Sequence, residues 1–239
     1  MAEVTPTPEE VAANVALAQA QADKEAAEAE SLRAEARKKT AEALVAETNA
    51  KKASFDLLKA EYEESKRLAS DEFHHIYRFR GQVDGSTVGK CLAQLSTWHR
   101  LDPKSDIEIV FSSPGGSILD GFELFDYIQF LKQEGHYVVT STQGMAASMA
   151  GVLLQAGNKR VMGKSAWLLI HEASFGTGGS VGQVEDTVEW VKMMQDRILD
   201  IFAERSVMSR RDIRKNWTRK DWWMGAETAL KHGFVDELA

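Results

Sequence analysis

Ser148 lies in the least polar stretch of this chain, "TQGMAASMAGVLLQAG" (residues 142–157). A β-rich run ends at Gly144 and a helical pattern begins close to Ser148, so the hydroxyl would sit at a sharp strand-to-helix turn. Small neighbours such as Ala147 and Ala150 leave room for that turn and for a substrate. This arrangement is similar to a nucleophile elbow, although the sequence lacks the G-x-S-x-G motif. A serine that fills a tight contact explains the same residues, and here both interpretations stay open.

Three further places supply the other parts that acyl transfer needs. His171 ends the apolar run "AWLLIH" at a predicted strand end, on the same sheet edge as Ser148, where an imidazole can act as a general base. Asp221 precedes two tryptophans, so we expect partly buried surroundings in which a carboxylate needs a partner such as an imidazole N–H. The loop "SSPGG" (residues 112–116) opens a helix with two glycines whose N–H groups suit an oxyanion or a phosphate. Each has a plainer explanation alone: a structural histidine, a solvated acid and an ordinary turn. Together they supply a nucleophile, a base, an acid and an oxyanion cradle.

The adjacent histidines His74 and His75 do not predict a metal site. Neighbouring residues of a strand point to opposite faces, and no cysteine or acidic cluster accompanies this pair. We therefore expect neither a metal nor a cofactor.

Composition narrows the class of protein. The chain has 239 residues and a formal net charge of −7, with 44% hydrophobic and 27% charged residues, which suits a soluble protein and gives no reason to expect nucleic acid as a partner. The single cysteine, Cys91, has apolar neighbours and indicates a small core residue in a reducing compartment. We see no secretory signal and no apolar run near the ~20 residues that span a bilayer. We expect a cytoplasmic protein with no membrane partner.

Two regions of different character must position these residues. From Pro8 to residue 72 there is no glycine and no further proline, and alanine, glutamate and lysine dominate. Thr7 can cap a helix, Pro8 suits the first helical position, and Glu10 completes a capping box. We predict a helical extension over residues 1–72, one helix or two, with a weak coiled-coil face. A partly disordered charged tail is the alternative.

From residue 73 to residue 239, short β-rich runs alternate with helical patterns. Strands are predicted near residues 74–81, 106–113, 137–144, 159–163 and 166–173, and helices near 86–100, 117–135, 145–157, 182–205 and 225–232. Such alternation predicts an α/β fold with a largely parallel sheet and crossover helices. In these folds the loops at the strand ends carry the chemistry.

Four ordered motifs make the chain similar to a known family: "FSSPGGSILDG", "GMAASMAGVLLQAG", "LLIHEASFGTGG" and "RKDWWMGAETALKHGFVDEL". They resemble the ClpP family of serine peptidases over roughly residues 73–239. The resemblance implies a crotonase-like ββα spiral with a handle, made of a glycine-rich strand and then a helix. By position it assigns Ser148 as nucleophile, His171 as base, Asp221 as third triad member, and the backbone N–H groups of Gly116 and Met149 as oxyanion donors.

The same resemblance implies a serine endopeptidase that hydrolyses unfolded polypeptides through an acyl-enzyme inside an oligomeric barrel of stacked rings, with an AAA+ unfoldase as a candidate partner. Two departures stand out. The long helix replaces the short segment that forms axial loops in relatives, which bears on how an ATPase would dock. The stretch "RRDIRKNWTRKDWW" before Asp221 is basic where relatives are more acidic, which bears on the third triad member.

Three other functions fit parts of the sequence. A phage capsid maturation protease would share the chemistry and would explain a scaffold-like helical extension. A crotonase-type acyl-CoA enzyme would share the spiral fold and an oxyanion hole of two N–H groups, but it needs no Ser-His-Asp triad. A non-catalytic ring subunit is the third, and the complete triad argues against it.

Overall fold

The computed structural model describes residues 7–239, which form two compact units divided between Arg67 and Leu68. The predicted domain boundary, residue 72, lies in the turns that follow the first unit. Among residues 7–239, no helix is long and apolar enough to cross a membrane.

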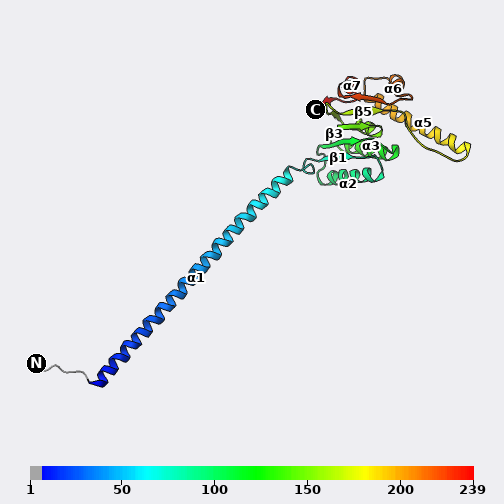
Figure 1. The fold of residues 1–239 in the computed structure, drawn as a ribbon. Helices are drawn as coiled ribbons and strands as arrows, with labels where there is room; N and C mark the ends of the chain where they lie inside the picture. The colour runs from blue at the N-terminus through cyan, green and yellow to red at the C-terminus, as the bar shows by residue number, and fades with distance from the viewer. Residues whose placement is uncertain (1–6) are drawn as a thin grey trace. The chain divides into compact units, whose positions relative to one another are not determined.

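The first unit is one continuous helix, α1 (Pro8–Leu68) (Figure 1). Its predicted start is confirmed: Pro8 is the first helical residue, the Glu10 N–H donates to the Thr7 hydroxyl, and Glu10 accepts from the Thr7 N–H at 2.8 Å. Ion pairs four residues apart, such as Lys51 with Glu47 at 2.6 Å, support the exposed helix surface. The structure describes every residue of α1, and none of them is buried.

The second unit is built on a seven-stranded sheet. Five strands run parallel in the order β1-β2-β3-β4-β7, β5 pairs parallel with β3, and β6 pairs antiparallel with β5. The strands are β1 (Ile76–Arg80), β2 (Ile107–Ser113), β3 (Val138–Ala147), β4 (Lys159–Met162), β5 (Trp167–Ile170), β6 (Trp222–Gly225) and β7 (Glu237–Leu238). The predicted α/β class and parallel sheet are confirmed.

The helices cover the sheet and close the core. They are α2 (Gly85–Leu101), α3 (Ile118–Gln133), α4 (Met149–Leu154), α5 (Val181–Glu204), α6 (Arg210–Trp217) and α7 (Ala226–Lys231). Helices α2, α3 and α4 pack in turn against one another and against the sheet (Figure 1). Phe111, Leu124 and Leu153 are completely buried between these layers, as alternating strand residues and one helix face require.

Strand β3 changes neighbours along its length. Val139–Thr142 pairs with β4, whereas Met145–Ala147 pairs with β5. Gly144, with φ +99°, lies between the two parts, and the pairing with β2 shifts register at the same level. The strand therefore passes the predicted end at Gly144, and α4 is shorter than predicted because the strand takes residues as far as Ala147.

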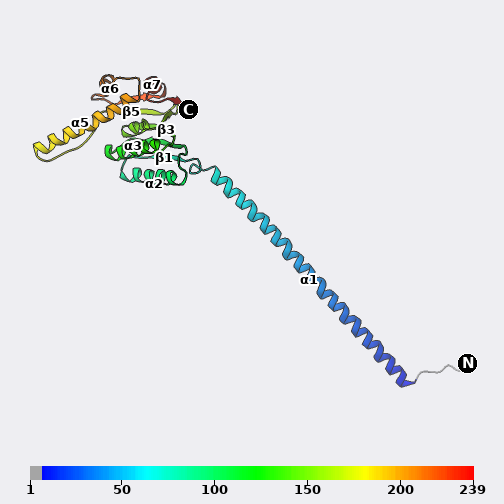
Figure 2. The ribbon, with the colours of Figure 1, turned by 180° about the vertical axis from the view of Figure 1, so that it is seen from behind.

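The glycine-rich half of the predicted handle differs from expectation. Residues 171–180 form no strand, although α5 follows as predicted. A Cβ added at Gly176 or Gly178 would meet no atom within 4 Å, so among the described residues no strand lies beside these two glycines to pair with them. Figures 1 and 2 show the segment running out from the sheet alongside α5, whose first turns project from the sheet and whose chain then returns to it.

The basic stretch before Asp221 is largely helix α6, which the sequence analysis did not predict. Its arginines face acids of α5: Arg210 and Arg214 lie 3.3 Å and 2.6 Å from the Asp196 carboxylate. The positive charge of this segment is thus partly balanced within the fold.

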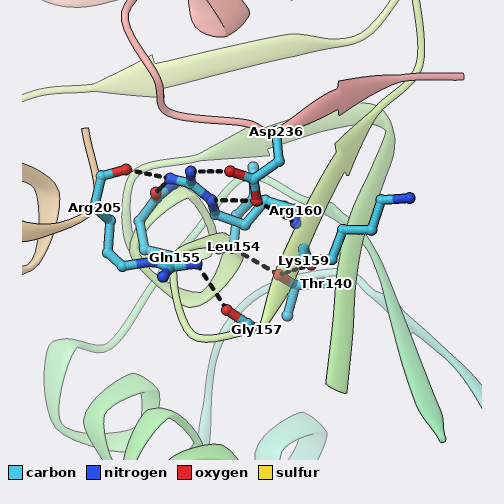
Figure 3. A network of polar contacts seen from close by, with 8 residues as sticks. All are labelled: Thr140, Leu154, Gln155, Gly157, Lys159, Arg160, Arg205 and Asp236. Atoms are coloured by element: carbon cyan, nitrogen blue, oxygen red, sulfur yellow. Dashed lines mark hydrogen bonds and ion pairs between the residues drawn. The ribbon is translucent and has the colours of Figure 1, made fainter. Parts of the chain in front are cut away.

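A buried arginine ties the end of the chain to the sheet (Figure 3). Arg160 of β4 donates to both carboxylate oxygens of Asp236, to Gln155 Oε1 at 2.8 Å and to the Arg205 carbonyl at 2.5 Å. Burial raises the pKa of the Asp236 carboxyl, but the hydrogen bonds and charge of Arg160 outweigh it and leave the pKa below its ordinary value. This pair fixes the strand order β4-β7 at the edge of the sheet.

Candidate active site

The parallel pairing of β3 with β5 places Ser148 close to the segment that carries His171. The last pair of this ladder joins Ala147 to Leu169, and the Ser148 N–H donates to the Leu169 carbonyl at 3.0 Å. Both strands end here on the same edge of the sheet, so the next residues of each chain open into the same space.

Ser148 has a backbone conformation that a residue with a side chain seldom adopts. Its φ is +55° and its ψ is −123°, between the last strand residue and the first residue of α4. Such a residue persists because its surroundings hold it, and strained positions of this kind concentrate at functional sites. The turn has the character of a nucleophile elbow: a serine on a tight bend between a strand and a helix.

The loop after β2 lies against this turn. A Cβ on Gly115, which has φ +90°, would come within 2.6 Å of the Ser148 Cβ and 2.9 Å of the Met149 nitrogen. The loop is held from its other side by Val83, whose N–H donates to the Gly115 carbonyl at 2.9 Å. Glycine at 115 is therefore what allows the two backbones to approach so closely.

Two backbone N–H groups at this contact are unused. Neither the Gly116 N–H nor the Met149 N–H donates a hydrogen bond to any residue that the structure describes. Gly116 and Met149 line the same cavity as Ser148, so these donors are available to an oxygen bound beside the serine.

The antiparallel pairing of β5 with β6 brings Asp221 toward His171. The outermost pair joins Ile170 to Trp222, so His171 and Asp221 are the next residues on the two chains. The His171 Nδ1 lies 4.0 Å from the Asp221 Oδ1, farther than a hydrogen bond. The expectation of partly buried surroundings for Asp221 is wrong: its side chain is 63% exposed, because β6 forms the outer edge of this part of the sheet.

A cavity of about 150 Å³ joins the site residues. Ser148 and His171 both line it, and apolar side chains, Val152 and Ile198 among them, form much of its wall. Asp221 is not among the lining residues, which fits a residue standing behind the imidazole. No hydrogen bond joins Ser148 to His171 within residues 7–239, and catalytic hydrogen bonds are often long in a site without substrate.

From the sequence we expected that His74 and His75 do not form a metal site. In the part of the chain that the structure describes, no group of three or more histidine, cysteine or acidic side chains is placed to hold a metal ion.

Comparison with known proteins identifies the family. The sequence model of the Clp protease family matches residues 61–239, three quarters of the chain. The chain belongs to the Clp protease family. It is 35% identical over 161 residues to an ATP-dependent Clp protease proteolytic subunit of Bacteroides thetaiotaomicron, covering 66% of this chain and 70% of the relative. It is 31% identical over 181 residues to a subunit of the same name from Streptococcus suis, covering 74% and 89%.

Membership in the Clp protease family makes this chain a serine-type endopeptidase of the ClpP kind, and its fold is the ClpP-like α/β fold that the motifs implied. Another Clp protease subunit, from Tropheryma whipplei, is 35% identical over 158 residues, covering 65% of this chain and 86% of the relative.

Three polar or aromatic residues of this Clp protease site were missed by sequence reasoning. Glu172, Gln195 and Trp217 all line the cavity. Glu172 directly follows His171, and that position was the available signal. Gln195 and Trp217 gave none, because their place in the site depends on how α5 and α6 pack.

Proposed function

We propose that Ser148, His171 and Asp221 act as the catalytic triad of this peptidase. The His171 Nδ1 faces Asp221, which leaves Nε2 to take the proton from the Ser148 hydroxyl. The alkoxide attacks the scissile carbonyl, His171 returns the proton to the leaving amine, and water then hydrolyses the acyl-enzyme. The single observation that carries the proposal is Ser148 on a strained turn, opening on the cavity that His171 also lines.

The Gly116 and Met149 N–H groups would stabilise the oxyanion of the tetrahedral intermediate. Both are free of other acceptors within the described chain, and Gly115 keeps the two loops in contact. Removing one donor of this kind from a serine peptidase raises the barrier by about 3 kcal/mol.

The substrate that fits this site is an extended, unfolded polypeptide. A second hollow of about 260 Å³ shares Gly116 and Ile118 with the first and continues past Phe175 and Trp190. Two adjacent hollows, both with apolar walls, can hold neighbouring side chains of one extended chain, which a folded substrate cannot present.

We also propose that the peptidase domain, residues 73–239, assembles into stacked rings and works with an ATPase in the cytoplasm. The curated relatives are named proteolytic subunits of an ATP-dependent protease. Helix α5 exposes Val181, Trp190 and Met193, three large apolar side chains of the kind that oligomers bury. Native mass measurement tests the assembly, and a monomer at micromolar concentration would contradict it.

The triad is tested with unfolded casein and a fluorophosphonate probe. The wild type should cleave casein and take up the probe at one serine, whereas the Ser148→Ala variant should fold normally and do neither. Unchanged cleavage by Ser148→Ala would refute the triad, and a crotonase-type enzyme would leave the probe unreacted. His171→Ala should likewise lose labelling, because no base would remain to activate the serine.

A further inference from the structure

The base and the acid of the proposed triad, His171 and Asp221, lie on two segments that are paired as β5 and β6. The pairing stops just short of both residues. Their antiparallel ladder ends at the pair Ile170 and Trp222. Beyond it both segments leave the sheet, and no ladder bond fixes the distance between His171 and Asp221. Because the Asp221 side chain is largely exposed and accepts no hydrogen bond among the described residues, its distance from the imidazole depends on its backbone.

A side chain closes this gap beyond the ladder. The Glu172 Oε2 accepts the backbone N–H of Arg219 at 2.7 Å. Glu172 is the residue after His171, and Arg219 lies two residues before Asp221. One charge-assisted hydrogen bond therefore ties the histidine segment directly to the turn that carries the aspartate.

The backbone conformation of the turn at Arg219 requires stabilisation of this kind. Arg219 has φ +55°, a left-handed conformation that is unfavourable for a residue with a Cβ. The next residue, Lys220, donates its N–H to the Trp217 carbonyl at a long 3.2 Å. A carboxylate that accepts the Arg219 N–H stabilises this conformation, and with it the place where Asp221 leaves the turn.

The histidine segment is itself anchored to the body of the domain. Gln195 of α5 accepts the Ala173 N–H at 2.9 Å, and both residues line the catalytic cavity. Glu172, between His171 and Ala173, is thus fixed from behind and can hold the Arg219 turn in place.

We infer that Glu172 is a positioning residue of this peptidase, which keeps Asp221 within reach of His171 by holding the Arg219 turn. This inference rests on the proposed triad. Glu172 takes no proton and touches no reacting atom in this scheme; it acts through Asp221. An acceptor oxygen at this position, rather than a negative charge as such, is what the role requires.

Substitutions separate the acceptor from the charge. Glu172→Ala removes both and should lower kcat for a fluorogenic peptide ten- to hundredfold, since displacement of a triad member by about 1 Å costs on the order of 10²-fold. Glu172→Gln keeps an acceptor oxygen and should retain most of the rate. Glu123→Ala, at an exposed glutamate of α3, is the matched control for loss of a carboxylate and should cleave like the wild type.

A double-mutant cycle tests whether Glu172 acts through Asp221. If it does, Glu172→Ala should cost little further rate in an Asp221→Ala background. The rate at which the fluorophosphonate labels Ser148 should fall in Glu172→Ala as it should in Asp221→Ala, because either change weakens the activation of the serine by His171. Thermal unfolding of each variant confirms that the fold is kept.

The outcomes are distinct. Additive losses in the cycle would overturn the inference. So would a Glu172→Gln variant that loses as much rate as Glu172→Ala, because the negative charge and not the acceptor oxygen would then be what matters. A Glu172→Ala variant that cleaves at the wild-type rate would overturn it too. If Ser148→Ala itself cleaves, the proposed triad fails instead.

Discussion

Gly115 lies where the loop after β2 meets the turn that carries Ser148, and its replacement by alanine probes the whole arrangement. A Cβ there would lie 2.5 Å from the Ala147 carbonyl oxygen, 2.6 Å from the Ser148 Cβ and 2.9 Å from the Met149 nitrogen. Ordinary contacts begin at 3.4 Å, so the loops must part by roughly 0.5 to 0.9 Å.

That movement displaces the proposed oxyanion donors and the proposed nucleophile, Ser148, together. Misplacement approaching 1 Å costs on the order of 10²-fold in rate, and full loss of one donor costs about 10² to 10³-fold. We therefore expect kcat of Gly115→Ala to fall by about 10² to 10³. Its φ of +90° adds strain for alanine, which should lower the free energy of unfolding by about 1–3 kcal/mol.

The assay is cleavage of a fluorogenic peptide at saturating substrate, with thermal unfolding and the fluorophosphonate labelling rate measured on the same samples. Gly89→Ala in α2 is the control, because a Cβ there would meet no atom within 4 Å. It should leave the rate unchanged and raise stability by about 0.5–1 kcal/mol. A folded Gly115→Ala protein with the wild-type rate would refute the close approach of the two loops as the basis of the oxyanion site.

Three other predictions follow from the same structure. Ser148→Gly should be inert yet more stable than Ser148→Ala by about 1–3 kcal/mol in urea unfolding, because glycine relieves the strain of a positive φ; equal stabilities would contradict that strain. Asp236→Asn should lose about 2–3 kcal/mol at pH 7, since it leaves Arg160 buried without its carboxylate, with the value moderated because the Asp236 side chain is 39% exposed. Because the pKa of Asp236 is lowered in the folded protein, its contribution to the free energy of unfolding is complete above the ordinary carboxyl value of 3.8 and is lost as pH falls through the folded-state pKa. The free energies of unfolding of the variant and the wild type should therefore converge below pH 3.8. Burial raises the pKa of the Cys91 thiol, so iodoacetamide at pH 8 should leave the folded protein unmodified and label it after unfolding in guanidinium; rapid labelling of the native protein would show that Cys91 is accessible.

Local patterns determined a good deal of this protein. The run without glycine after Pro8 and the Thr7–Glu10 capping box predicted a helical extension of one helix or two, because propensity and capping act within a few residues, and the structure shows one continuous helix. Alternation of apolar runs with glycine and proline specified the β2 and β3 strands and the helices beside them. The four motifs specified the family and the residues that we propose as the catalytic site.

The sequence patterns missed β6, the two-residue strand β7 and helix α6, and the reasons are physical. The four residues of β6 form a strand because β5 lies beside them, and a strand this short carries no period of its own. Helix α6 is highly charged. Its buried residues are Ile213 and Trp217, which are too few to reveal a helical period in the sequence. The glycine-rich segment 171–180 shows the converse: the family pattern indicated a strand, and within residues 7–239 no strand pairs with it.

Tertiary structure alone decided how the site is assembled. The β5–β6 register sets His171 opposite Asp221, and the β3–β5 register sets Ser148 close to them. The contact at Gly115 brings in the backbone N–H groups that we propose as oxyanion donors. These pairings join residues far apart in the chain, so local sequence patterns carry no signal of them, and they form only when the chain entropy lost in bringing distant segments together is offset by the packed sheet. The sequence alone indicates which residue types could take part in the reaction, whereas the packing of the sheet sets the distances between them.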